Sequence, residues 1–337
     1  MKRWIGYTLW MLVTLACLTG CDWIWEYPEG PGVDPTLVRV RMELQVDFEP
    51  ISEPFVTSYA DVRGGDYDVR YQIEVYAASG VDAGKRIARL VETEQTLSDR
   101  GKNFPFEFDL HAERYDVYTW IDFVPRGTEK DYHYLTGDLR RVRIADPNIC
   151  GVDTKDAFAG KIAIDLTPYR DRLFAKVVFP VAMERPFGKF KIQTTDVRQF
   201  LESYKPGTYT DIVPAETHLT YTGFFPCGYN QDTRLADMEY FCTEVNHTAP
   251  VMEYEESSAV LSYDYVFVCS DQTFVTADIE VHNSAGERLN TVKGIRIPIQ
   301  RNKLTVVKGE FLTTDFSGGG TGIDDGFDGE IVISVPE

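Results

Sequence analysis

The chain has 337 residues, and its 53 acidic side chains outnumber its 34 basic ones, which sets the formal net charge at −19. A chain this negative is not expected to bind nucleic acid, because such binding depends on basic side chains that neutralise the phosphates. Anionic lipid headgroups should repel it as well. Apolar residues make up 43% of the sequence, which is ample for two packed cores, and the length favours two domains.

Residues 1–20 have the pattern of a secretory signal peptide. Lys2 and Arg3 precede an apolar stretch, residues 4–18, which is shorter than the roughly 20 apolar residues of a comfortable membrane span. The stretch ends in Leu18-Thr19-Gly20-Cys21, which resembles the lipobox of bacterial lipoproteins. That resemblance implies cleavage just before Cys21 and acylation of its thiol, for example with palmitate. The alternative is an ordinary signal peptide followed by a chance cysteine.

A lipid on Cys21 would hold the chain to a membrane that its own charge does not favour. We therefore expect an outer-membrane location with the lipid as membrane partner, and residues 21–36 as a lipidated linker. Asp22, directly after the cysteine, favours display at the cell surface over the periplasmic face.

Apolar and polar side chains in the mature chain alternate with the two-residue period of β-strands. In residues 37–48 the apolar side chains alternate with charged and polar ones, which predicts a half-buried strand. Turn residues separate further strand-like runs, and many short strands of this kind favour β-sandwiches. These runs are residues 69–75, 104–110, 117–123, 161–166, 173–180, 189–194, 263–268, 275–282, 295–300, 301–311 and 330–335.

Helical periodicity is scarce, and it predicts one short helix over residues 196–204, after Thr195 as N-cap. The fold class is therefore all-β, with two tandem β-sandwiches. We place the first sandwich at residues 37–168 and the second at residues 169–316. Residues 317–337 follow as a glycine-rich connector and a terminal strand.

Several short motifs follow one another along the chain. They are the strand Tyr115-Asp116-Val117-Tyr118-Thr119-Trp120-Ile121-Asp122-Phe123, the loop Asp131-Tyr132-His133-Tyr134, Asp156-Ala157-Phe158-Ala159-Gly160, Glu184-Arg185-Pro186-Phe187-Gly188-Lys189-Phe190, residues 297–309 and Gly326-Phe327-Asp328-Gly329. Together these motifs resemble the fimbrillin-like lipoproteins of the Bacteroidales, which include major, minor and anchoring subunits of type V pili. The resemblance implies two transthyretin-like sandwiches in tandem and no catalysis.

The resemblance also implies assembly by strand exchange, and therefore other pilus subunits as partners. In such subunits a protease cuts after an arginine near the N-terminus, an edge strand leaves, and the terminal strand of another subunit fills the groove. Here residues 37–48 are the candidate for the leaving strand, and Arg63 is the candidate processing site. Ile331, Ile333 and Val335 are the candidate donor strand. The alternatives are a solvated loop arginine and a tail folded back on its own domain.

A second class of function is a surface glycan-binding β-sandwich lipoprotein. Aromatic faces stack on sugar rings, and Trp120, with Tyr118 and Asp122 on the same strand face, could form such a platform. Alternation places Val117, Thr119 and Ile121 on the opposite face, so one of the two faces must be buried. We favour core packing for Trp120. Tryptophan is scarce in the mature body, which favours the pilus reading.

No catalytic residue, cofactor or metal site is expected. Hydrolase and phosphate-loop motifs are missing from the sequence, as are paired Cys-x-x-Cys motifs, and the five histidines are scattered. The acidic run at residues 324–330 lacks EF-hand spacing and reads as a solvated turn. Export permits disulfides among four mature-body cysteines, and three pairings stay open: these are Cys150, Cys227, Cys242 and Cys269.

Overall fold

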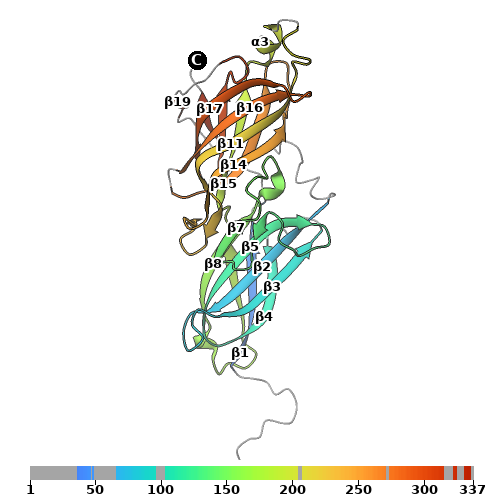
Figure 1. The fold of residues 1–337 in the computed structure, drawn as a ribbon. Helices are drawn as coiled ribbons and strands as arrows, with labels where there is room; N and C mark the ends of the chain where they lie inside the picture. The colour runs from blue at the N-terminus through green and yellow to red at the C-terminus, as the bar shows by residue number, and fades with distance from the viewer. Residues whose placement is uncertain are drawn as a thin grey trace, which may run out of the picture.

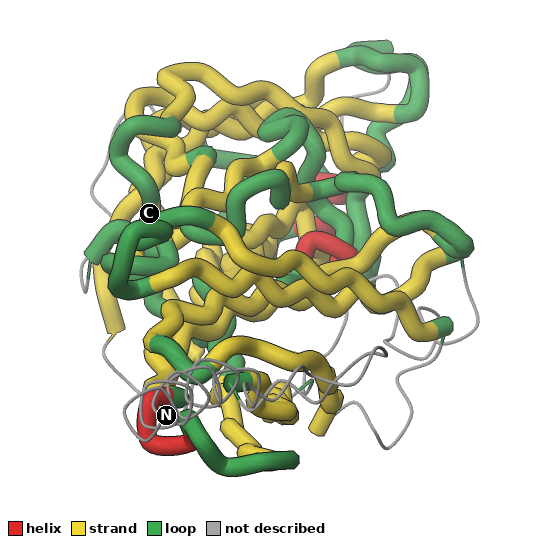
Figure 2. The backbone as a smooth tube through the Cα atoms, turned by 90° about the horizontal axis from the view of Figure 1, so that it is seen from below, coloured by secondary structure: helices red, strands yellow, loops and turns green. Residues whose placement is uncertain are grey.

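The computed structural model describes residues 36–46, 48, 66–95, 103–203, 207–270, 273–314, 322–324 and 330–334, the last two segments as backbone alone. Two β-sandwiches follow one another along the long axis of the molecule (Figure 1). Seen from below, nearly the whole described chain is strand and loop (Figure 2). The expected all-β class with tandem sandwiches and a short helix is confirmed; the helix is α3 (Val197–Glu202).

The first sandwich has a three-stranded and a four-stranded sheet. The strand order in the first is β4-β1-β9, with β1 (Leu37–Gln45), β4 (Asn103–His111) and β9 (Lys176–Ala182). The order in the second is β3-β2-β5-β8, with β2 (Tyr67–Ala77), β3 (Arg86–Glu94), β5 (Arg114–Pro125) and β8 (Phe158–Asp165). Their facing side chains form one apolar core.

The second sandwich also has two sheets. One has the order β15-β10-β18-β20-β19, with β10 (Phe187–Thr194), β15 (Ala259–Phe267), β18 (Leu304–Gly309), β19 (Gly322–Asp324) and β20 (Glu330–Ser334). The other has the order β14-β11-β16-β17, with β11 (Pro214–Pro226), β14 (Phe241–Pro250), β16 (Thr273–Asn283) and β17 (Arg288–Ile299).

A small fifth sheet joins the two halves of the chain. Its order is β13-β12-β7-β6, with β6 (Tyr134–Leu135), β7 (Arg141–Ile144), β12 (Gly228–Asn230) and β13 (Leu235–Ala236). β7 from the first half pairs antiparallel with β12 from the second. Two short 3-10 turns, η3 (Asp153–Lys155) and η4 (Thr167–Tyr169), flank β8 in sequence.

The strand pairing places the change of sandwich later than the expected limit after residue 168. β9 starts at Lys176, yet it pairs in parallel with β1 and completes the first sandwich. We therefore infer that the second sandwich begins after Ala182, with β10. The sequence misleads here because a strand reads the same whichever sheet it joins.

Candidate functional site: strand β1 and the groove that holds it

β1 is the middle strand of its sheet, not the edge strand that the family resemblance implies for residues 37–48, because β9 pairs with its second side. Its register with β4 sets Val40 opposite Phe108, and its register with β9 sets the same residue opposite Val177. The contact with β4 is antiparallel and the contact with β9 is parallel. Without β1, the facing backbone edges of β4 and β9 would both lose their partner, which would leave a groove one strand wide.

The inner face of β1 fills that groove with apolar side chains. Val38, Val40, Met42 and Leu44 are all 0% exposed. They belong to the same core as Tyr71 of β2, whose ring stacks on Phe104 at 3.9 Å between centroids. The alternation in the sequence therefore predicted this face of the strand correctly. A replacement strand would need apolar side chains at every second position.

The outer face of β1 carries ion pairs across to β4. Arg39 Nε lies 2.8 Å from Asp109 Oδ1, and Arg41 Nη1 lies 2.8 Å from Glu107 Oε1. The hydrogen bond from Arg39 lowers the pKa of the Asp109 carboxyl. These side chains are about half exposed, so the pairs add little stability. They do match one register of β1 against β4, because a two-residue slip would set either Glu43 opposite Glu107 or Arg41 opposite Pro105.

The predicted site residues lie at the two ends of the chain. Cys21, Arg63 and Val335 are outside the described residues. Ile331 and Ile333 fall in β20, whose backbone pairs in parallel with β18 and antiparallel with β19. The terminal strand thus lies in a sheet of its own second sandwich. Lipid attachment, processing and strand donation stay predictions.

In the first sandwich, the outer face of the sheet β3-β2-β5-β8 is covered by another segment of the chain. Arg70, Gln72, Glu74 and Tyr76 alternate along β2 on the side away from the core, and each is 5% exposed or less. The segment 126–140 lies over them. Arg70 donates to Asp122 Oδ2 at 2.7 Å and to Asp131 Oδ1 at 2.9 Å. Two carboxylates thus offset the buried guanidinium charge.

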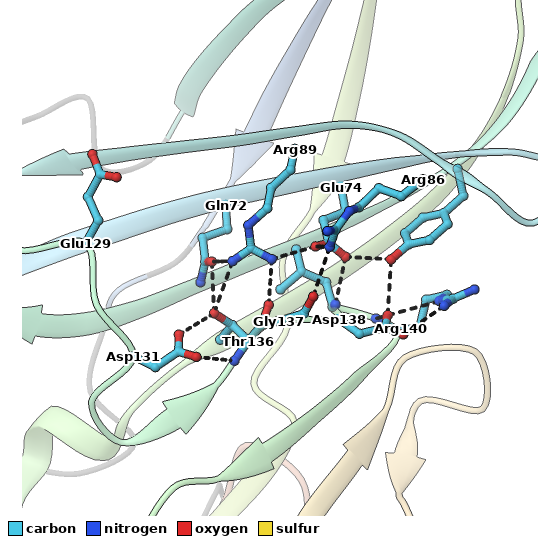
Figure 3. Close-up of polar contacts among 12 residues, drawn as sticks. Gln72, Glu74, Arg86, Arg89, Glu129, Asp131, Thr136, Gly137, Asp138 and Arg140 are labelled. Atoms are coloured by element: carbon cyan, nitrogen blue, oxygen red, sulfur yellow. Dashed lines mark hydrogen bonds and ion pairs between the residues drawn. The ribbon is translucent and has the colours of Figure 1, made fainter.

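Glu74 is the centre of this cover (Figure 3). Its carboxylate accepts hydrogen bonds from Arg86, from Arg89 at 2.6 Å, from the Tyr76 hydroxyl at 2.8 Å and from the Leu139 amide at 2.8 Å. The two arginines also donate to backbone carbonyls of the covering segment, at Gly137 and Thr136. A network with this many charge-assisted bonds holds the segment against β2, so this sheet face is a structural contact.

Trp120 lies in the contact between the sandwiches. It is 0% exposed, and its ring centroid is 5.3 Å from that of Tyr134 and 6.3 Å from that of Tyr229 in β12. The opposite face of β5 is buried too, with Thr119 and Ile121 at 0%. The expectation that one face is buried was therefore incomplete, since both are. Core packing for Trp120 is confirmed, and the proposed sugar platform has no exposed surface.

Three buried ion pairs fasten the segment around η3 to the second sandwich. Asp153 accepts from Lys189 of β10 at 2.8 Å, and Lys155 lies 2.5 Å from Asp264 of β15. Directly after the turn, Asp156 pairs with Arg185 at 2.8 Å. Burial lowers the pKa of Lys189, although Asp153 opposes the shift. Sequence reasoning missed these pairs because no spacing rule links residues so far apart.

The structure shows which two of the four cysteines lie close enough to form a disulfide. Cys227 Sγ and Cys242 Sγ are 2.8 Å apart, and Cys150 is buried. The Cys227–Cys242 pair is therefore the one ready to form a disulfide in an oxidising compartment. Burial raises the pKa of the Cys227 thiol, which lowers the fraction of reactive thiolate and slows oxidation. Joining two thiols also removes two electrons, so the reaction needs an oxidant such as an added disulfide or a thiol oxidase.

Oxidised glutathione is expected to join Cys227 to Cys242, with both thiol hydrogens passing to the glutathione as it is reduced. The link closes a loop of 15 residues and should stabilise the chain by about 3 kcal/mol. Non-reducing peptide mass spectrometry and urea unfolding of a chain that starts at Asp22 would measure both effects. Cys227→Ser should abolish them, and the matched Cys269→Ser should not. Four free thiols after oxidation would contradict the pairing.

The histidines are less scattered in space than in sequence. His218 of β11 and His282 of β16 stack at 4.1 Å between ring centroids. Each follows a glutamate by two positions, as Glu216 and Glu280, and that repeated Glu-x-His spacing was the available signal. Spacing of two sets both side chains on one face of a strand.

Comparisons with known proteins give one family match and several distant structures. The model of a family of unknown function, DUF6562, matches residues 35–336. No curated protein matches significantly. A candidate cell adhesion protein from Bacteroides eggerthii shares 12% identity at a TM-score of 0.48, with 90% of this chain and 96% of that chain covered.

Two further structures are similar at the same level. The fimbrial anchor protein Mfa2 from Porphyromonas gingivalis shares 9% identity at a TM-score of 0.42, with 76% of this chain and 82% of that chain covered. A candidate polysaccharide-binding protein from Bacteroides thetaiotaomicron shares 11% identity at 0.43, with coverage of 76% and 80%. Within the described part of this chain, helices long and apolar enough to cross a membrane are absent.

Proposed function

We propose that this chain, which belongs to the family of unknown function DUF6562, is a cell-surface lipoprotein that serves as a fimbrillin-like structural or adhesive subunit of a type V pilus. Assembly would proceed by β-strand exchange, and the role would be non-enzymatic. The lipid on Cys21 would hold the chain to the outer membrane until the strand that follows it is cut away, or permanently if it is not.

The observation that carries the proposal is the position of β1. An edge strand can be lost with one row of hydrogen bonds, but β1 has a partner on each side. Its loss would expose two backbone edges and four side-chain positions that are now fully buried. Such a groove binds another strand through backbone hydrogen bonds, with alternate apolar side chains for specificity. Arg63, between β1 and β2 in sequence, is where a cut would release the strand.

The terminal strand supplies a matching donor. Residues 331, 333 and 335 are Ile, Ile and Val, so every second position is apolar as in β1. In the free chain this strand pairs with β18 of its own second sandwich. Exchange would then replace an intramolecular parallel contact by an intermolecular one. A long glycine-rich connector before it, including Gly318, Gly319 and Gly320, has the reach to allow that.

Cleavage by an arginine-specific protease is expected to cut the chain after Arg63 and to start assembly. A chain from Asp22 to Glu337 should change from a monomer to a series of multimers, measured by multi-angle light scattering after gel filtration. Multimers should lack residues 22–63 by mass spectrometry, because the entering strand displaces β1. Arg63→Ala should stay uncut there and monomeric under the same protease.

A second variant separates the donor from the groove. Ile331→Asp combined with Ile333→Asp should be cut normally but should stay monomeric, because a charged donor cannot fill apolar positions. If the cleaved wild-type chain stays monomeric and keeps residues 37–63 bound, strand exchange is the wrong account of this protein.

A further inference from the structure

Two neighbouring strands of the second sandwich present the same Glu-x-His pair to the outside. β11 carries Glu216 and His218, and β16 carries Glu280 and His282. The antiparallel register sets His218 opposite Glu280 and Glu216 opposite His282. The four side chains therefore form a checkerboard on one sheet face, with each imidazole beside a carboxylate on its own strand and another across the sheet.

The donor atoms of this group are close enough to share one ion. The nitrogen and oxygen ligand atoms of His218, Glu280 and His282 all lie within 4.8 Å of one another. Glu216 Oε1 is 2.8 Å from His218 Nε2. Ligands bonded at about 2.0–2.2 Å to one tetrahedral ion lie about 3.3–3.6 Å apart, so the outermost of these atoms must move about 1 Å closer together. All four side chains are partly exposed and can rotate to do so.

One hydrogen bond sets the direction of His282. Its Nδ1 lies 3.3 Å from the carbonyl oxygen of Gly286, which can only accept, so Nδ1 carries the hydrogen. In the neutral ring, Nε2 then presents a lone pair to Glu280 Oε2 at 3.3 Å. The other oxygen of Glu280, Oε1, accepts from Arg288 Nη1 at 3.3 Å, which leaves Oε2 as the oxygen that faces the imidazole. A cation placed between Nε2 and Oε2 could bind both. A backbone carbonyl that orients a histidine in this way is a common second contact in metal sites.

The surroundings hold the group in place and leave it accessible. β11 and β16 are the two central strands of their sheet, with β14 and β17 on either side. Ligands on paired strands are positioned more rigidly than ligands on loops. His218 and Glu280 also line a pocket of about 350 Å³ whose other walls include Thr220, Asn246 and Lys293. An ion can reach the group from solvent through this pocket.

We propose that His218, Glu280 and His282 bind a divalent transition-metal ion, with zinc as the best match. Two imidazoles and one carboxylate are a zinc donor set, and three protein ligands leave a fourth tetrahedral position for Glu216 or water. Imidazole donors select zinc, copper and nickel over magnesium and calcium. The site requires neither strand exchange nor the lipid anchor, so it stands independently of the pilus role.

Titration calorimetry with zinc chloride tests the proposal directly. A chain from Asp22 to Glu337 without a histidine tag is expected to bind one zinc ion, whereas calcium and magnesium should give no heat at the same concentration. His218→Ala and His282→Ala should each weaken zinc binding by at least about tenfold, because losing a ligand costs more than losing the group that orients one. Cobalt(II) absorption in the visible range provides a second measure, since a tetrahedral site gives intense bands.

The matched control is His111→Ala. His111 is the other exposed histidine and lies in the first sandwich, where it contacts Thr36. This variant should bind zinc as the wild type does. Glu280→Gln keeps the shape of the side chain while removing its charge, and it should weaken binding with circular dichroism unchanged. Ion pairs between protonated histidines and the glutamates are the rival account. Absence of zinc binding by the wild type, or wild-type affinity for zinc in both His218→Ala and His282→Ala, would overturn the site.

Discussion

Replacing Lys155 with methionine is expected to lower the free energy of unfolding by about 3–5 kcal/mol. The Lys155 ammonium is 2.5 Å from Asp264 Oδ1, and the two side chains are 2% and 0% exposed. Methionine fills a similar volume but carries no charge, so the Asp264 carboxylate stays buried without a cation. The Tyr221 hydroxyl at 3.0 Å and the Tyr265 amide at 2.8 Å still donate to it. Urea unfolding followed by circular dichroism measures the change.

A double-variant cycle isolates the pair. Lys155→Met with Asp264→Leu should be more stable than Lys155→Met alone, because no unpaired charge remains. The exposed pair Arg39–Asp109 provides the matched control, and Arg39→Met should change the free energy of unfolding far less than Lys155→Met, because solvent screens an exposed pair. Equal losses in Lys155→Met and Arg39→Met would show that the pair at η3 contributes no more than a surface contact.

Trp120→Ala is expected to lower the free energy of unfolding by about 3–5 kcal/mol. The side chain is fully buried among aromatic rings from both halves of the chain, and its removal leaves a cavity that those rings cannot close. Thermal and urea unfolding would measure the loss. Trp120→Phe should cost less, because it keeps an aromatic ring in the same space.

The exposed residue Leu173 serves as the control for Trp120. It is 60% exposed, so Leu173→Ala should change stability by about 0.5 kcal/mol or less. Wild-type stability in Trp120→Ala would contradict the packing role of this side chain.

The junction that these two predictions probe has a consequence for assembly. Apolar packing around Trp120, the β7–β12 pairing and the buried pairs at η3 all join the same two halves. These contacts make the junction between the two sandwiches part of a continuous apolar core with buried ion pairs. That property suits a chain whose first sandwich would receive a strand from one neighbour while its terminal strand is donated to another.

The local pattern of residues predicted much of the fold. Alternation over residues 37–48 identified β1 and its inward face, since period two leaves only one way to bury an apolar row. The helix prediction at residues 196–204 located α3, although it named the wrong cap. Asp196 is the N-cap, and its carboxylate accepts from the amides of Leu312 and Thr313 instead of capping the helix.

The hydrophobic pattern of the sequence did not predict burial where the covering segment is distant along the chain. β2 and β5 are polar or mixed on their outer faces, and the sequence gives no sign that residues 126–140 and the second sandwich cover them. Charged residues such as Arg70 and Glu74 read as solvated, yet both are buried with their partners. A charge can be buried only where its partner arrives, and the partner's position is a property of the packed chain.

The sequence by itself determined the all-β class, most of the strands, the two cores and the inward face of β1, because these depend on neighbours along the chain. It did not predict β3, β11 or β14, so the Glu-x-His pair on β11 was not assigned to a strand. Only the tertiary structure decided that β9 completes the first sandwich and that Cys227 meets Cys242. It also decided that the two Glu-x-His pairs lie side by side on one face of a sheet. These contacts depend on which strands become neighbours and in which register, and pairing of that kind follows from packing the whole chain.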